Sequence, residues 1–259
     1  MSSRILARPA ASVTLVRSAA FAIATAALAM LPAQARAGVS GSVALTSDYV
    51  FRGVSQTNRE PALQGGMEYA ADSGFYLGAW GSNVSWLSDL STAAAPVSNS
   101  LELDGYLGYR GTLGKTVGID AGALYCRYPG DYPPGFNSPD TGEVYVGVSA
   151  GLFSAKYSYA LTDLFGYANS DGSGYLDLGA NWQFRPGWTM NAHAGRQWIR
   201  NNAAFEYSDW KLGVTRTFGN GVAIAAAYAG SDADDALYTN AFDRRVADGS
   251  VTITLSKGF

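Results

Sequence analysis

Residues 174–198 read GYLDLGANWQFRPGWTMNAHAGRQW, and this stretch decides the fold. Apolar and polar side chains alternate through its first half. One face of that half carries Leu176, Leu178, Ala180, Trp182 and Phe184. Arg185-Pro186-Gly187 is a turn signal, and alternation resumes after it. The pattern predicts two strands, each with one apolar and one polar face and each longer than most strands of soluble sheets. A tilted strand of about ten residues is long enough to cross a bilayer.

The same alternation recurs along most of the chain and predicts twelve strands. They lie near residues 39–52, 62–71, 74–86, 100–111, 116–128, 140–150, 152–163, 174–185, 187–199, 207–219, 221–230 and 249–259. Tight turns alternate with long connections at 53–61, 87–99, 129–139, 164–173, 200–206 and 231–248. An outer-membrane barrel has this rhythm, since its outer loops are long and its periplasmic turns short. Lipid offers the backbone no partners, so the sheet must close. We therefore predict an all-β fold, a single transmembrane antiparallel β-barrel of about twelve strands with both termini periplasmic.

The start of the chain has the pattern of a secretory signal. Arg4, Arg8 and Arg17 precede an apolar run over 18–31, and Ala35-Arg36-Ala37 is a small-residue cleavage site. The run falls short of the ~20 residues of a transmembrane helix. We expect a signal peptide at 1–37, cleaved after Ala37, and a barrel at 38–259. The predicted location is the bacterial outer membrane.

The composition excludes several classes of partner and site. The chain has 18 basic and 21 acidic residues, and loss of residues 1–37 removes four Arg and no acid, which leaves a net charge of −7. Nucleic acid is therefore not expected as a partner. Cys126 is the only cysteine, so we expect no disulfide and no cysteine-based metal site. We predict a structural, half-buried Cys126, no metal and no cofactor.

Aromatic residues cluster near the ends of the predicted strands, as in the two interfacial belts of a membrane barrel. In strand 74–86 aromatics occupy both faces, and its sides stay unassigned. The belt candidates are Tyr49, Phe51, Trp86, Tyr109, Tyr125, Tyr157, Tyr159, Trp182, Phe184, Trp188, Trp198 and Phe218.

The alternation places many charged side chains on the presumed inner face. The acidic set is Asp48, Glu68, Glu102, Asp104, Asp120, Glu143, Asp177 and Asp209, and the basic set is Arg52, Arg110, Lys156, Arg185 and Lys211. If the lumen is an open pore, more acids than bases predict a weak cation preference. Ion pairs across a narrow lumen that hold the barrel shape are an equally weighted alternative. Asp48 and Arg52 share a face and could join such a network.

Four segments resemble known outer-membrane proteins. The end of the chain, from Val251 through Ile253 and Leu255 to Phe259, resembles the C-terminal signal that barrels present to their assembly machinery, from which Lys257 departs. LTSDYVFRG at 45–53, SGFYLGAWGSNV at 73–84 and ELDGYLGY at 102–109 resemble the TorF-type porin family, long catalogued only as a conserved family of unknown function. The resemblance runs over essentially the whole chain after residue 37. It implies an outer-membrane barrel and, by name, a pore.

These observations predict a porin-like channel for passive diffusion of small hydrophilic solutes or ions. The expected partners are outer-membrane lipid, the barrel assembly machinery and a small solute or ion. One alternative is a structural or adhesive barrel with ligand-binding outer loops. Another is a barrel-embedded hydrolase, which would have to use His193, the only histidine. We expect no enzyme, because His193 lies mid-strand on the lumen face.

Overall fold

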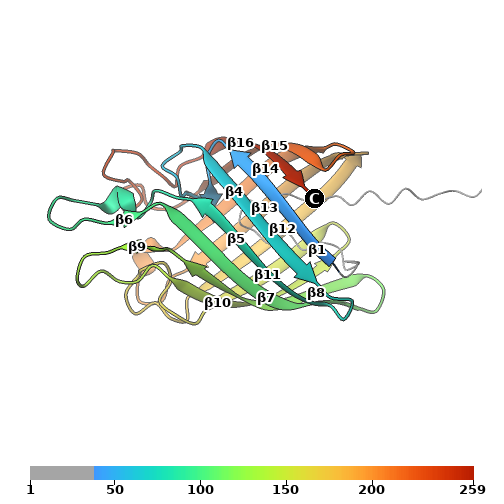
Figure 1. The fold of residues 1–259 in the computed structure, drawn as a ribbon, viewed down its shortest axis with the longest axis horizontal. Helices are drawn as coiled ribbons and strands as arrows, with labels where there is room; N and C mark the ends of the chain where they lie inside the picture. The colour runs from blue at the N-terminus through green and yellow to red at the C-terminus, as the bar shows by residue number, and fades with distance from the viewer. Residues whose placement is uncertain (1–37) are drawn as a thin grey trace, which may run out of the picture.

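The computed structural model describes residues 38–259, and the predicted signal peptide lies outside the described residues (Figure 1). This part of the chain forms strands and two short 3₁₀ helices, η1 (Ser88–Leu90) and η2 (Ala203–Phe205). No helix of residues 38–259 is long and apolar enough to cross a membrane. Twelve strands build the main sheet: β1 (Gly38–Thr46), β4 (Ala62–Ala70), β5 (Phe75–Asn83), β7 (Leu101–Leu113), β8 (Val117–Arg127), β10 (Thr141–Ala150), β11 (Phe153–Ala160), β12 (Gly174–Arg185), β13 (Trp188–Trp198), β14 (Tyr207–Thr217), β15 (Val222–Ser231) and β16 (Ser250–Gly258).

The twelve strands close into one antiparallel barrel, which confirms the predicted fold. Each strand pairs with its neighbours along the chain, and β1 closes the ring by pairing with both β4 and β16. Ser42, for example, lies between Gly66 on β4 and Gly258 on β16. Closure leaves no free edge of N–H and C=O groups, which is what a bilayer demands.

The two ends of the barrel differ in the length of their connections (Figure 1). Long loops gather at one end, and they contain the short strands β2 (Val50–Phe51), β3 (Val54–Ser55), β6 (Ser98–Asn99) and β9 (Gly130–Asp131). The other end has tight turns, such as 114–116 and 186–187, together with the start of β1 and the C-terminus. The predicted alternation of long and short connections is present throughout.

The outer and inner faces of the barrel differ in polarity. Outward side chains such as Leu63, Leu107, Val146 and Ile253 are apolar and exposed. Buried side chains of the same strands are largely polar, including Thr46, Gln64, Asp120, Glu143 and Thr254. A polar interior within an apolar outer band is the opposite of a soluble protein and the signature of a membrane barrel.

Nine of the twelve belt candidates are exposed on the outer face, and three are not. Tyr49 is fully buried inside the barrel, and Phe51 and Trp86 pack against the same interior cluster. The expected strand 39–52 was too long, because β1 ends at Thr46 and the chain then turns inward. In β5, whose sides were unassigned, Phe75 and Leu77 face outward and Tyr76 faces inward.

The C-terminal strand presents an apolar outer face. Val251, Ile253, Leu255 and Phe259 are all exposed on the outside of the barrel. The backbone of Phe259 exchanges two hydrogen bonds with Gly41 at 2.9 and 3.0 Å, so the terminal residue continues the β16–β1 pairing. Lys257 bends toward the turn before β15, where its ammonium donates to the Asn220 carbonyl. The position that departs from the signal pattern thus places its charge at the barrel rim.

Candidate functional site in the barrel lumen

A loop after β1 folds into the barrel, and we call residues 47–61 the lumen hairpin. Its two short strands β2 and β3 pair around Arg52 and Gly53, both of which have positive φ angles (44° and 78°). Asp48 holds the hairpin closed, since its Oδ1 accepts hydrogen bonds from Ser55 (2.6 Å) and Thr57 (3.2 Å). A Cβ at Gly53 would lie 2.6 Å from the Cβ of Asp209, so the hairpin tip presses directly on the opposite wall.

Arg52, at the hairpin tip, joins three strands of that wall. Its Nη2 donates to both oxygens of Glu143 on β10, at 2.7 and 3.0 Å, and its Nη1 donates to Gln197 on β13 at 2.9 Å. The guanidinium also lies 4.2 Å from the ring centroid of Tyr175 on β12. With 7% of its side chain exposed, Arg52 forms a buried, charge-assisted contact that narrows the lumen.

His193 on β13 is the centre of a second charged group. Its Nε2 lies 2.7 Å from Asp209 Oδ1 on β14, and its Nδ1 lies 3.3 Å from Asp177 Oδ1 on β12. The Tyr175 hydroxyl donates to Asp209 and lies 3.1 Å from His193 Nε2. Both ring nitrogens therefore contact carboxylates, an arrangement that suits an imidazolium with two donors.

A cavity lies between the tip of the lumen hairpin and the barrel wall that carries Glu143, His193 and Asp209. Its volume is about 60 Å³, counted as space for the centres of water-sized molecules. Basic side chains of its lining are Arg52, Lys156, His193 and Lys211, and acidic ones are Glu143, Asp177 and Asp209. Such a lining offers hydrogen-bond donors and acceptors of both charges to a small polar solute.

A third ion-pair group fills the lumen toward the short-turn end. Arg110 on β7 contacts Glu68 on β4 at 2.5 Å and Asp120 on β8 at 3.4 Å. Its guanidinium stacks on Tyr76, whose hydroxyl bonds to Asp120 (2.6 Å) and lies 2.5 Å from the hydroxyl of Tyr145. Glycines make room for these rings, since Tyr76 lies opposite Gly108 and Tyr145 opposite Gly122. A Cβ at Gly122 would lie 2.6 Å from the Tyr145 hydroxyl.

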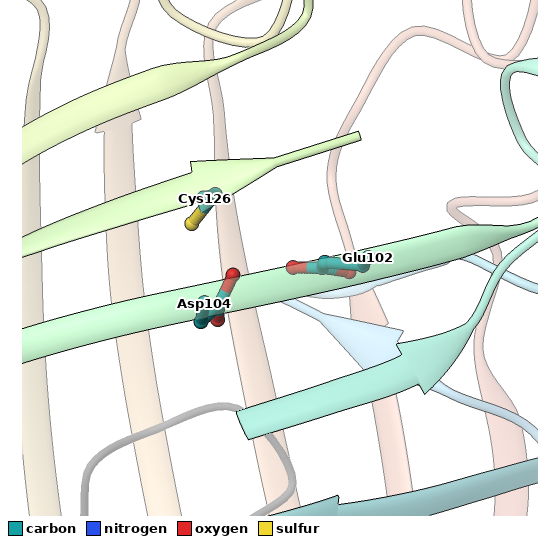
Figure 2. Close-up of side chains that lie close together, drawn as sticks. All are labelled: Glu102, Asp104 and Cys126. Atoms are coloured by element: carbon teal, nitrogen blue, oxygen red, sulfur yellow. The ribbon is translucent and has the colours of Figure 1, made fainter. Parts of the chain in front are cut away.

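Two carboxylates and a thiol lie together where β7 pairs with β8 near the long-loop end. Figure 2 shows one Asp104 oxygen and the Cys126 sulfur pointing toward each other, with Glu102 next along the same face of β7. Cys126 and Glu102 are both 2% exposed, and Tyr49 of the lumen hairpin donates to Glu102 Oε1 at 3.4 Å.

A family model described as a bacterial protein of unknown function (Gcw_chp) matches residues 32–259. The chain belongs to the Gcw_chp family. The match covers the whole barrel, so the lumen hairpin and the three charged groups described above all lie within the family region. A search of curated proteins found no significant match.

Solved porin structures share the barrel fold of this family member. The NanC porin superposes with a TM-score of 0.52 at 11% sequence identity, covering 85% of this chain and 99% of the other. The KdgM porin gives a TM-score of 0.51 at 7% identity, with 85% and 99% covered, and it is also known in complex with disordered oligogalacturonate. At such low identity the similarity establishes the fold, that of outer-membrane porins.

The structure places the predicted lumen residues inside the barrel but groups them differently from the sequence pattern. Asp48 serves the hairpin and is not paired with Arg52. Arg185, expected inside, is exposed at the end of β12. Five of the predicted inner carboxylates contact a basic side chain. Glu143 contacts Arg52, Glu68 and Asp120 contact Arg110, and Asp177 and Asp209 contact His193. The other three are Asp48, Glu102 and Asp104.

Sequence reasoning missed the Cys126 group. Cys126 is deeply buried, where a half-buried position was expected, and it lies between an interior apolar cluster and the two carboxylates. The group was missed because of the register of β7 and β8. The predicted turn at 112–115 pairs Asp104 with Ala123, whereas the observed turn at 114–116 sets Asp104 opposite Cys126.

Proposed function

We propose that the protein is an outer-membrane channel with a narrow lumen for passive diffusion of small hydrophilic solutes or ions. The observation that carries this proposal is the polar cavity inside a closed barrel with an apolar outer face. A barrel that served only as a scaffold has no need for a cavity lined by buried side chains of both charges. Burying such charges costs free energy unless they are paired or used.

The lumen hairpin sets the width of this channel. It crosses from β1 to the opposite wall and is held there by Arg52 with Glu143 and Gln197. Solutes therefore pass beside the hairpin tip, through the cavity that Lys156, His193 and Lys211 help to line. We expect a small conductance that increases when the tip is released.

Planar bilayers test both statements. Wild-type protein should give discrete conductance steps, and Arg52→Ala combined with Glu143→Gln should give larger ones. The double change leaves no carboxylate without its partner, so the barrel should stay folded. Arg200→Ala with Asp171→Asn, an exposed loop pair, is the matched control and should conduct like wild type.

Absence of steps from correctly folded wild-type and hairpin variants would sink the channel and favour a structural or adhesive barrel. Equal steps from wild type and from the Arg52/Glu143 variant would remove the hairpin from the account.

Location and assembly follow from the two ends of the chain and from the barrel. We propose export through a signal peptide at 1–37, insertion into outer-membrane lipid with both termini periplasmic, and recognition of the C-terminal strand by the barrel assembly machinery. The similarity to TorF-type porins supports the same assignment. A weak cation preference would rest on Glu102 and Asp104. The other lumen carboxylates contact basic side chains, apart from Asp48, which accepts hydrogen bonds within the lumen hairpin.

We also propose that the barrel is not an enzyme. His193 was the only candidate base, and both of its ring nitrogens contact carboxylates. A base that activates a serine needs one free nitrogen facing the hydroxyl. Ester or lipid hydrolysis by wild type that is lost in His193→Ala would overturn this assignment.

A further inference from the structure

The group of Glu102, Asp104 and Cys126 combines two carboxylates and a thiol in a buried part of the barrel wall (Figure 2). We propose that these three side chains bind a thiophilic divalent cation of the zinc class. The proposal stands apart from the channel function, because it concerns a bound ion in the wall and holds whether or not the lumen conducts.

The backbone brings the three ligands to one place. Asp104 and Cys126 are direct cross-strand partners of β7 and β8, and Glu102 precedes Asp104 by two residues on the same face. One ligand atom from each residue can be chosen so that all three lie within 4.8 Å of one another. Zinc bonds of about 2.0–2.3 Å imply ligand separations of roughly 3.5 Å in a tetrahedron. A contraction of about one ångström, within reach of the flexible Glu102 side chain, closes the site.

Unpartnered oxygens point to a missing positive charge. Glu102 Oε2 and Asp104 Oδ1 are buried and have no hydrogen-bond partner. No ion pair among residues 38–259 includes either carboxylate. Cys126, which lies beside both carboxylates, belongs to the interior apolar cluster that includes Tyr49, Leu87 and Tyr128. Two neighbouring carboxylates in such surroundings are costly without a counter-charge. A water molecule could donate to both oxygens but would bring no charge.

The donor set selects the kind of cation. A thiolate favours Zn²⁺, Co²⁺ or Cd²⁺ over Mg²⁺ and Ca²⁺, which prefer oxygen ligands only. The Cys126 thiol gives its proton to solvent when the metal–sulfur bond forms. Three protein ligands leave a fourth position for water. Asp104 is only partly buried, so the ion can enter from the lumen.

Titration of the folded barrel with Co²⁺ tests the proposal, because a thiolate bound to Co²⁺ gives an intense charge-transfer absorption band. Wild type should show this band, saturating at one Co²⁺ per chain. Zn²⁺ should displace the Co²⁺, and excess Mg²⁺ should not. Cys126→Ser should abolish the band, and Glu102→Gln with Asp104→Asn should weaken binding at least ~10-fold. Asp171→Asn, an exposed loop carboxylate, should bind like wild type.

Absence of the band in wild type would overturn the proposal, and this result needs no variant to fold. A band that persists in Cys126→Ser, or an affinity unchanged by the carboxamide double variant, would equally overturn it and assign the ion to surface carboxylates. Heat-dependent gel migration verifies that each variant is folded. Conductance plays no part in any of these readouts, so failure of the metal site and failure of the channel are distinguishable.

Discussion

Arg52 at the tip of the lumen hairpin has a strained backbone conformation that its side-chain contacts maintain. Its φ of 44° lies in the left-handed region, which residues other than glycine seldom adopt. Strain of about 1–3 kcal/mol at such a position persists only where the surroundings impose it. The guanidinium is fixed by Glu143, Gln197 and the ring of Tyr175, and these contacts impose the conformation. We infer that the strain is tolerated because the hairpin tip must reach across the lumen.

Asp48 makes the stability of the lumen hairpin depend on pH. Burial raises the pKa of its carboxyl above the ordinary value, and hydrogen bonds from Ser55 and Thr57 only partly oppose this. The folded hairpin thus holds the proton more tightly than the unfolded chain does. The stability contributed by Asp48 is fully present below the unfolded pKa of about 3.9 and is lost as the pH rises through the folded pKa.

In Asp48→Asn this loss should disappear. Hydrogen exchange of residues 47–61, compared as protection factors between mildly acidic and neutral pH, should show wild type losing more protection than the variant. Identical pH dependence in both proteins would show that Asp48 does not control the hairpin.

Glu102 and Asp104 form no ion pair among residues 38–259, and unlike Asp48, which also forms none, they lie on a strand of the barrel wall. Glu102→Gln with Asp104→Asn should therefore lower any cation preference of the channel. The measurement is the reversal potential in a salt gradient, made with a chelator present so that bound metal does not mask the carboxylates. Asp171→Asn in an exposed loop controls for general surface charge. A reversal potential unchanged by the double variant would exclude both residues from selectivity.

At the scale of strands, alternation and turn signals predicted what lies within the sheet and failed where the chain leaves it. The faces of β7, β10, β12 and β14 were read correctly, apart from Arg185 at the end of β12, because each strand has an apolar outer face and a polar lumen face. Tyr49 and Phe51 continue the period-2 pattern of β1, so the pattern gave no sign that the chain turns inward after Thr46. The turn depends on contacts of Asp48 with Ser55 and Thr57, and of Tyr49 with Glu102, which no local pattern reveals.

The pairing of charges was equally beyond the sequence. Strand alternation assigns a side chain to the lumen. It does not give the position of that side chain along the barrel axis or the strands that it contacts across the lumen. Arg52 contacts Glu143 only because the hairpin carries it over the lumen, and Arg110 reaches Glu68 two strands away. Cross-strand register depends on the exact turn, and the observed turn at 114–116, which starts two residues later than predicted, is what sets Asp104 opposite Cys126.

The last residue of the C-terminal strand, Phe259, is expected to be needed for efficient assembly of the barrel. Phe259 continues β16 by two backbone hydrogen bonds to Gly41, and its ring is exposed on the outer face. Removal of Phe259 should reduce the amount of folded barrel in the outer membrane severalfold, because the final β16–β1 contact and the apolar end of the strand are lost together. Folded barrel is measured as the heat-sensitive band in outer-membrane fractions. Lys257→Leu, which restores the apolar pattern, should assemble at least as well as wild type. Normal assembly without Phe259 would show that the terminal residue is not read.

On the scale of the whole molecule, the asymmetry of the barrel makes a prediction about its orientation. The long loops and the lumen hairpin share one end, while the tight turns and both ends of the described chain share the other (Figure 1). Outer-membrane barrels have short periplasmic turns and longer extracellular loops, so the long loops should face the cell exterior. Ala94 in the connection between β5 and β7, and Lys115 in the turn between β7 and β8, are both exposed and probe the two ends.

Labelling of intact cells with a membrane-impermeant maleimide decides this orientation. Ala94→Cys should be labelled in intact cells, and Lys115→Cys should be labelled only after the outer membrane is opened. Wild type is the natural control, because its single cysteine, Cys126, is buried in the lumen wall and should stay unlabelled in both conditions. Labelling of Lys115→Cys but not Ala94→Cys in intact cells would invert the barrel and place the lumen hairpin at the periplasmic mouth. The hairpin would then control exit into the periplasm, and solutes entering from outside would meet the Arg110 group first.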